Sequence, residues 1–211
     1  MNVYIDLGAY KGLMMSRVIK TFDEIDLFVA FEPVPNFFHK LKKKFGNNSK
    51  VKLYNSAAGV ADEKKELYLC KIGKKKIGQG STLIPGVYDS SITVKSINFS
   101  KYLKENFKIS DNIILKIDIE GYEYNLLEHL VETGNIKYIN NIFCEWHLIK
   151  LKKRLGRKSK AIKMHSDLVN KLQELGFNLT GENSKDEFSV VHRKVRKSKG
   201  TFLRERVIKG G

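Results

Sequence analysis

The chain has 211 residues, 42% of them hydrophobic, which is enough to bury the core of one globular domain. The formal net charge is +16, and the two cysteines, Cys70 and Cys144, are too few for a disulfide-stabilised scaffold. No apolar run has the length of a transmembrane helix. We therefore expect one domain in a reducing, cytoplasmic compartment.

The first predicted elements are a strand, a glycine-containing turn and a helix. Val3 to Ile5 form an apolar run typical of a buried strand, and the apolar spacing after residue 12 predicts a helix. Between them Asp6, Gly8 and Gly12 form the pattern D-x-G-x-x-x-G. A dinucleotide site would need G-x-G-x-x-G, whereas an acid beside the turn favours a cationic ligand, such as the sulfonium and amino groups of S-adenosylmethionine.

The second predicted strand, Leu27 to Phe31, ends in an acid. Glu32 follows Gly8 at about the spacing of ~20 residues at which an acid binds ribose hydroxyls. The alternative interpretation of Glu32 is a solvated loop carboxylate. Asn36 is predicted to be the N-cap of a basic helix at 37–45.

A third strand is predicted at 51–54, and an insertion follows it. Ser56 and Ala57, directly after this strand, are expected near the adenine of the cofactor. Ser81 and Thr82 either line the methionine end of the cofactor or the acceptor pocket, or form an ordinary flexible turn. The insertion contains four predicted segments: an edge strand at 65–71, a basic glycine-rich hairpin or loop at 74–80, a strand at 92–97 and a helix at 102–107.

Two further buried strands are predicted at 113–117 and 138–146, each followed by charged residues. A helix at 164–175 and an antiparallel pair at 178–180 and 187–192 come last. In open α/β sheets ligands bind at the carboxyl ends of the strands, so polar groups at these ends are expected to converge. Those groups are Asp6, Glu32, Asp118, Glu145 and His147.

Six blocks of sequence stand out between residue 3 and about residue 147. They are Asp-Leu-Gly-Ala-Tyr-Lys-Gly (6–12), Phe-Glu-Pro (31–33), Asn-Ser-Ala-Ala-Gly (55–59), Gly-Gln-Gly-Ser-Thr-Leu (78–83), Leu-Lys-Ile-Asp-Ile-Glu-Gly-Tyr-Glu (115–123) and Cys-Glu-Trp-His (144–147). In kind and order they resemble the FkbM family of class I S-adenosylmethionine-dependent methyltransferases, and the fifth block is the most specific. Tyr10 stands where the family frequently has Asn. The first strand begins unusually early, so we expect a catalytic domain from a longer glycan-synthesising polypeptide, with a glycosyltransferase domain as its neighbour.

The resemblance implies an α/β fold, with a Rossmann-like doubly wound sheet of about seven strands and a C-terminal antiparallel hairpin, in residues 1–193. A basic tail, 194–211, would follow. It also implies O-methylation of a sugar hydroxyl in a glycan or glycoconjugate acceptor. The predicted S-adenosylmethionine-binding residues are Asp6, Gly8, Tyr10, Gly12, Glu32, Pro33, Ser56, Ala57 and Asp118. The predicted substrate-binding residues are Ser81, Thr82, Glu120, Glu123 and His147.

The chemical step is assigned to Asp118, His147 and Glu145. Asp118 and Glu145 at the ends of neighbouring strands would suit one divalent cation, Mg²⁺ or Mn²⁺. Metal-dependent O-methyltransferases usually have a further Asp or Asn beside the second acid, where this chain has Trp146, so His147 or Glu120 would have to be the third ligand. His147 could instead be the general base. The alternative is that these acids only bind local backbone and His147 packs in a loop.

Two basic segments carry most of the excess charge. Residues 150–163 hold eight Lys or Arg and no acid, and residues 193–209 hold eight more and one Glu. They would attract polyanions, or form a solvated helix face and a frayed tail. With a neutral glycan as acceptor, we expect turnover to depend little on salt.

Other functions remain open at this stage. An RNA ribose 2′-O-methyltransferase could use Lys116, Asp118 and the basic segments, although no aromatic cluster interleaves the basic runs. A non-catalytic glycan- or nucleotide-binding module is a second alternative. An NAD-dependent oxidoreductase is disfavoured because G-x-G-x-x-G is absent.

Overall fold

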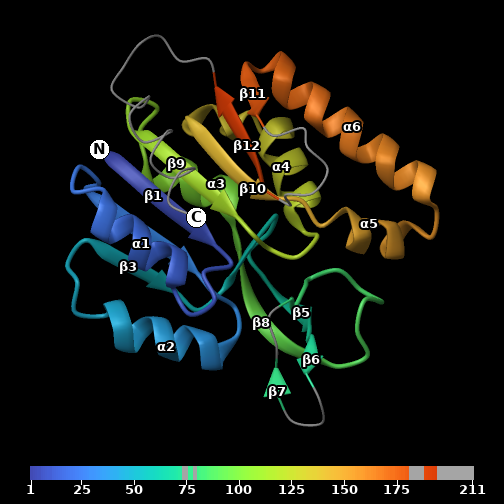
Figure 1. Cartoon of the computed structure of the whole chain (residues 1–211), viewed down its shortest axis with the longest axis horizontal. Coiled ribbons are helices and arrows are strands. Elements are labelled where there is room, and N and C mark those ends of the chain that lie inside the picture. The colour runs from blue at the N-terminus through green and yellow to red at the C-terminus, as the bar shows by residue number, and fades with distance from the viewer. Residues whose placement is uncertain (73–75, 78–79, 181–187, 194–211) are drawn as a thin grey trace.

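A computed structural model describes residues 1–72, 76–77, 80–180 and 188–193, with side chains for 1–70 and 80–177. Its centre is a seven-stranded sheet in the order β11-β12-β10-β9-β1-β2-β3 (Figure 1). All neighbours pair in parallel except β12, which is antiparallel to β10 and β11. The predicted fold class is therefore confirmed. The strands are β1 (Asn2–Leu7), β2 (Leu27–Phe31), β3 (Val51–Tyr54), β9 (Asn112–Ile117), β10 (Asn141–Glu145), β11 (Phe177–Thr180) and β12 (Phe188–Arg193).

Helices cover both faces of the sheet because the buried strands are apolar on both sides. In β1, Val3, Ile5 and Leu7 face one core, whereas Tyr4 faces the other. The first core also contains side chains of α3 (Phe99–Asn106), α4 (Glu123–Glu132) and α6 (Lys158–Glu174). The second contains side chains of α1 (Leu13–Thr21) and α2 (Pro35–Phe45). The alternation of side chains along a strand thus produces a doubly wound architecture.

The insertion forms a small sheet of its own beside the carboxyl ends of the central strands (Figure 1). Its order is β4-β8-β5, from β4 (Ala57–Gly59), β8 (Ser91–Asn98) and β5 (Glu63–Tyr68). A separate backbone pair joins β6 (Lys71–Ile72) to β7 (Lys76–Ile77). The three-residue strand β4 was not predicted, because Ala-Ala-Gly has little intrinsic strand preference.

Several element boundaries differ from the sequence predictions. Asn36 is not an N-cap: Pro35 begins α2, and its fixed φ suits the first helical turn. Helix α3 begins at Phe99, since the Asn98 side chain caps it by accepting a hydrogen bond from Lys101 N at 3.0 Å. The predicted strand start at 138 is wrong, because Asn135–Tyr138 form the 3₁₀ helix η1.

The basic segment 150–163 consists of two helices. Helix α5 (Leu148–Leu155) ends at Gly156, which has the left-handed φ of 64°, and α6 starts at Lys158, before the predicted residue 164. The tail 194–211 lies outside the described residues. Among those that are described, no helix has both the length and the hydrophobicity needed to cross a bilayer.

Candidate active site

The carboxyl ends of four central strands lie level with one another. Leu7 of β1 pairs with Phe31 of β2 and Ile117 of β9, and Ile117 pairs with Cys144 of β10. The predicted acids at these ends therefore meet at one edge of the sheet. A cleft of about 630 Å³, including its open mouth, lies there. Predicted site residues among those that line it are Gly8, Tyr10, Glu32, Pro33, Ala57, Ser81, Asp118 and Glu120.

The turn after β1 needs glycine at two positions for different reasons. Gly8 has φ 79°, and a Cβ there would lie 1.9 Å from the carbonyl oxygen of Asp118. Gly12 has φ 71°, and its Cβ would lie 2.4 Å from the ring of Phe45 in α2. Gly8 thus lets the cofactor turn approach β9, whereas Gly12 lets α1 begin against α2. Gly12 is not among the residues that line the cleft, and its assignment to cofactor binding stays a prediction.

Glu32 is held by the backbone of two turns. Its Oε2 accepts a hydrogen bond from Tyr10 N and its Oε1 accepts one from Val34 N, both at 2.8 Å. Burial raises the pKa of Glu32 to about 7, and these two amides oppose the rise. Each carboxylate oxygen retains a second lone pair, so Glu32 can still accept from ribose hydroxyls.

The region predicted for adenine is apolar apart from one hydroxyl. Ala57 and Pro33 line the cleft. Ser56 is buried beside them, and its Oγ has no hydrogen-bond partner within the described chain. A buried hydroxyl without a partner is costly, so this one fits a ligand with polar ring atoms.

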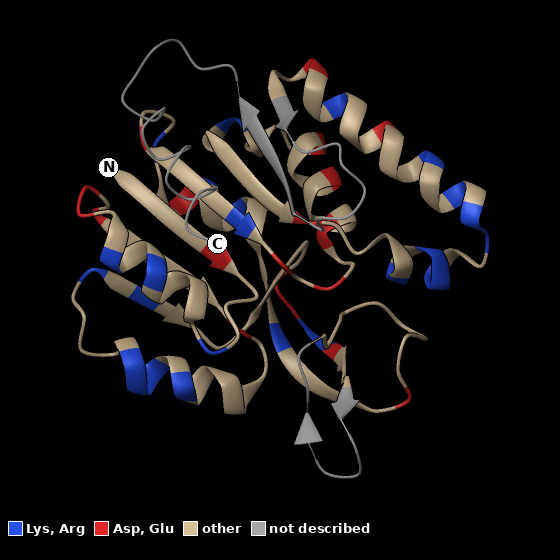
Figure 2. Ribbon diagram, in the orientation of Figure 1, with Lys and Arg blue, Asp and Glu red and all other residues tan. Residues whose placement is uncertain are grey.

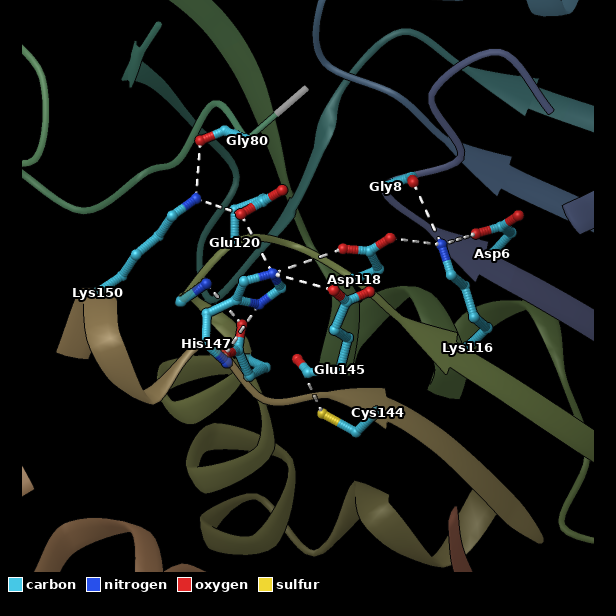
Figure 3. A network of polar contacts seen from close by, with 12 residues as sticks. Asp6, Gly8, Gly80, Lys116, Asp118, Glu120, Cys144, Glu145, His147 and Lys150 are labelled. Carbon is cyan, nitrogen blue, oxygen red and sulfur yellow. Dashed lines mark hydrogen bonds and ion pairs between the residues drawn. The ribbon is translucent and has the colours of Figure 1, made fainter. Parts of the chain in front are cut away.

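Asp6 does not reach the cleft surface, which corrects the expectation of direct cofactor contact. Its side chain is fully buried, and Oδ1 lies 3.0 Å from Nζ of Lys116. Lys116 also lies 3.2 Å from Oδ2 of Asp118 and donates to the carbonyl oxygen of Gly8 at 3.4 Å (Figure 3). Burial raises the pKa of Asp6 and Lys116 opposes the rise. Burial alone would lower the pKa of Lys116, but the two carboxylates outweigh it and raise this pKa.

His147 collects the acids at the other end of the cleft (Figure 3). Its Nε2 lies 3.1 Å from Glu120, 3.7 Å from Glu145 and 3.9 Å from Asp118. Burial alone would lower the pKa of His147. The hydrogen bond to Glu123 and the charges of Glu123, Glu120 and Asp118 outweigh it and raise this pKa to about 9. The imidazole is therefore protonated at neutral pH when the site holds no ligand.

Glu123 does not contact substrate, which corrects the sequence prediction. Its side chain is fully buried, because as the first residue of α4 it turns back over the helix start. Oε2 accepts from Gly121 N and Oε1 from His147 N, each at 2.7 Å, and Oε1 lies 3.5 Å from Nδ1 of His147. Glu123 thus turns Nε2 of His147 towards the acids at the cleft.

Lys150 joins this cluster to the insertion. Its Nζ pairs with Oε2 of Glu120 and donates to the carbonyl oxygen of Gly80 at 2.8 Å (Figure 3). Ser81, next to Gly80, lines the cleft. Thr82 does not: it is fully buried, its backbone pairs with Tyr68, and its Oγ1 accepts from Ile84 N at 3.2 Å. The assignment of Thr82 to substrate is therefore corrected.

The same cluster has the donors for a metal ion. Ligand atoms of Asp118, Glu120 and His147 all lie within 4.8 Å of one another. The carboxylates of Asp118, Glu120 and Glu145, together with one imidazole, suit Mg²⁺ or Mn²⁺. The sequence predicted Asp118 and Glu145 first, whereas the geometry favours Glu120 and His147 as partners of Asp118.

Sequence reasoning missed the parts played by two lysines. Lys116 belongs to the specific block 115–123, two residues before Asp118, so the alternation of a strand could have placed both side chains on one side. Lys150 had no such signal, because it meets Glu120 and Gly80 only through the packing of α5.

Comparisons with known proteins identify the family and the fold. The model of the methyltransferase FkbM domain matches residues 6–179. The structure of an FkbM methyltransferase from Methylobacillus flagellatus KT aligns with a TM-score of 0.54 and 11% identity, over 90% of this chain and 43% of that one. The chain thus spans less than half the length of the Methylobacillus protein.

Two further structures align at low identity. A Corynebacterium glutamicum protein gives a TM-score of 0.50 and 10% identity, over 93% of this chain and 73% of that one. An S-adenosylhomocysteine-bound methyltransferase from Podospora anserina gives 0.47 and 10%, over 91% and 71%. A comparison with curated protein sequences found no match. Since the family model spans most of the sequence, the chain belongs to the FkbM methyltransferases, which are S-adenosylmethionine-dependent.

Proposed function

We propose that the chain methylates a hydroxyl oxygen of a sugar in a glycan or glycoconjugate. The observation that carries the proposal is the convergence of Asp118, Glu120, Glu145 and His147 at the end of the cleft away from Glu32. Carboxylates and an imidazole accept and donate hydrogen bonds to the hydroxyls that cover a sugar. A carboxylate or a neutral imidazole can also take the proton that the hydroxyl must lose.

The cofactor end of the cleft has suitable groups for S-adenosylmethionine, which supplies an activated methyl on a positively charged sulfur. Glu32 would accept hydrogen bonds from the ribose hydroxyls, and Ser56 would pair with the adenine ring. Gly8 lines the cleft, where its main chain would face the ligand directly.

The acceptor end activates the hydroxyl. The hydroxyl oxygen bonds to the methyl carbon, the carbon–sulfur bond breaks with its electron pair retained by sulfur, and the hydroxyl proton goes to the protein. Asp118 is the first candidate to take this proton, because it lines the cleft and its Oδ2 lies 3.2 Å from Nζ of Lys116. Protonated His147 stabilises the negative charge that develops on the oxygen.

The acceptor end also fits a divalent cation. Asp118, Glu120 and His147 would hold Mg²⁺ or Mn²⁺, which would lower the pKa of the acceptor hydroxyl. In that case His147 would have to lose its proton, and Lys150 would have to release Glu120. The metal therefore competes with two cations of the chain itself.

Methyl-labelled S-adenosylmethionine tests the proposal. The protein is incubated with separate glycan and RNA pools, with and without chelator. We expect label in the glycan pool, in a product that resists mild base as a methyl ether does. Asp118→Asn, which keeps the shape of the side chain, should lose the transfer, whereas Asp89→Asn should keep it. Label in RNA alone would favour ribose methylation, and no transfer to any pool would favour a binding module. Full activity in chelator would exclude the metal.

A further inference from the structure

Three charged side chains form a buried chain between the cofactor turn and the acceptor end (Figure 3). Lys116 Nζ lies 3.0 Å from Asp6 and 3.2 Å from Asp118. Asp6 is fully buried, and Lys116 is its only ion-pair partner within the described chain. We call Asp6, Lys116 and Asp118 the charge triad.

The charge triad is negative overall, because it has two carboxylates and one ammonium group. The acceptor end does not cancel this charge, since the acids there outnumber His147 and Lys150 (Figure 3). In Figure 2 the ribbon is red where β9 and β10 end, and blue segments lie farther out, on α5, the adjoining end of α6, α1 and α2. A charge buried with little access to water acts over a longer distance than a surface charge.

The cofactor and its product differ in the property to which such a charge responds. S-adenosylmethionine and S-adenosylhomocysteine share adenine, ribose and the amino-acid group, so contacts with Glu32 or Ser56 cannot distinguish them. They differ in one methyl group and in the positive charge on sulfur. Gly8 and Asp118 line the cleft and follow β1 and β9, the two strands between β2, which Glu32 follows, and β10, which precedes His147. This is the stretch that must receive the sulfur if the methyl is to face the acceptor.

We propose that the net negative charge of the triad makes the protein prefer the cationic cofactor over its neutral product. Asp6 then acts through space and without contact, which explains why an acid buried beneath the cleft is placed at the end of β1. Loss of the charge on sulfur during the reaction weakens binding of the product, and this promotes its exchange for fresh cofactor. This preference concerns the cofactor, and it rests on the proposed function only for the position of the sulfur.

The test compares dissociation constants of the two ligands by calorimetry at pH 8 in chelator. Asp6→Asn makes the triad neutral. We expect the preference for S-adenosylmethionine to fall about tenfold, the order of effect of one unit charge that acts through the protein interior. Asp6→Asn with Lys116→Met restores a single negative charge, carried by Asp118, and should restore the preference. Glu24→Gln, which removes the charge of an exposed acid, is the control: it should leave the preference unchanged. Sinefungin has an ammonium group in place of the sulfonium, so its affinity should change across these variants as that of S-adenosylmethionine does.

An unchanged preference in Asp6→Asn would overturn the proposal. The proposal would also be overturned if the double variant had the same reduced preference as Asp6→Asn, because the effect would then come from local geometry and not from charge. Thermal unfolding shows first that each variant is folded. Should Asp6→Asn not fold, Asp118→Asn makes the same charge change at the cleft surface and decides the question in its place.

Discussion

The two ends of the cleft are built from different kinds of interaction. At the cofactor end, the groups that hold Glu32 are backbone amides of Tyr10 and Val34, within the turns that follow β1 and β2. At the acceptor end, side chains of the β9–α4 turn, β10 and α5 hold one another by charge, around His147 and Lys150. Glu32 is therefore held by main-chain groups that a substitution leaves in place, whereas the groups around His147 are side chains that single substitutions can change.

His147→Ala should break the acceptor end alone and give the largest effect. We expect turnover to fall by about 10²–10³, the usual cost of removing one group that stabilises a developing oxyanion. The dissociation constant of S-adenosylhomocysteine, which carries no charge on sulfur, should change by less than about twofold, because Glu32 lies at the other end of the cleft. His39→Ala, on the exposed side of α2, is the control. Near-normal turnover in the His147 variant would remove this residue from the chemical step.

Gly8→Ala tests whether the cofactor end depends on backbone shape. The new Cβ would lie 1.9 Å from the carbonyl oxygen of Asp118, so the turn must shift. We expect cofactor binding to be lost and the free energy of unfolding to fall by about 2–4 kcal/mol, measured with urea. Gly86→Ala is matched: its φ is also positive, at 77°, but no atom lies within 4 Å. Equal losses in both variants would show that φ strain, and not the close approach, matters at Gly8.

Glu32→Ala tests the side chain that the cofactor-end backbone holds. Cofactor binding should weaken by about 1–3 kcal/mol, the usual loss for hydrogen bonds to a charged group. Calorimetry measures the change, and Glu24→Ala, an exposed acid, is its control. An unchanged affinity would remove Glu32 from the ribose site.

The pH dependence of cofactor affinity also tests the role of Glu32, and we expect it to give the smallest effect. The pKa of Glu32 is about 7 in the free protein, and ribose hydroxyls would donate to its ionised form. Binding therefore expels a proton below pH 7, and affinity falls as the pH falls. We expect affinity about tenfold weaker at pH 6 than at pH 8, since each unit below the pKa costs about one factor of ten. Glu32→Gln should bind independently of pH over this range, and a slope that persists in it would assign the titration to another group.

The sequence predictions were more accurate at the cofactor end of the cleft than at the acceptor end. The strands around Gly8 and Glu32, and the identity of both residues as lining the cleft, could be predicted because strand, turn and helix follow one another locally. Helix α5 was missed, since its basic run 150–154 hides the single buried Leu151 that anchors it.

At the acceptor end the sequence identified the acids but could not predict the role of each one. The block 118–123 contains three acids, and only the fold shows that Asp118 and Glu120 line the cleft while Glu123 points into the core. That distinction depends on where α4 starts. The role of Lys150 depends on the distance between α5 and the insertion, which no local pattern encodes.

The contact between Gly8 and the Asp118 carbonyl has a consequence for how such enzymes diversify. The cofactor turn and the strand end that carries Asp118 fit so closely that neither can be altered alone, and they must be inherited as one module. Between β4 and β8, the insertion contributes Leu67, Gly80, Ser81 and Leu83 to the lining of the cleft. Grafting another relative's insertion between β4 and β8 is therefore the route by which a new acceptor could be acquired while the methyl donor stays the same.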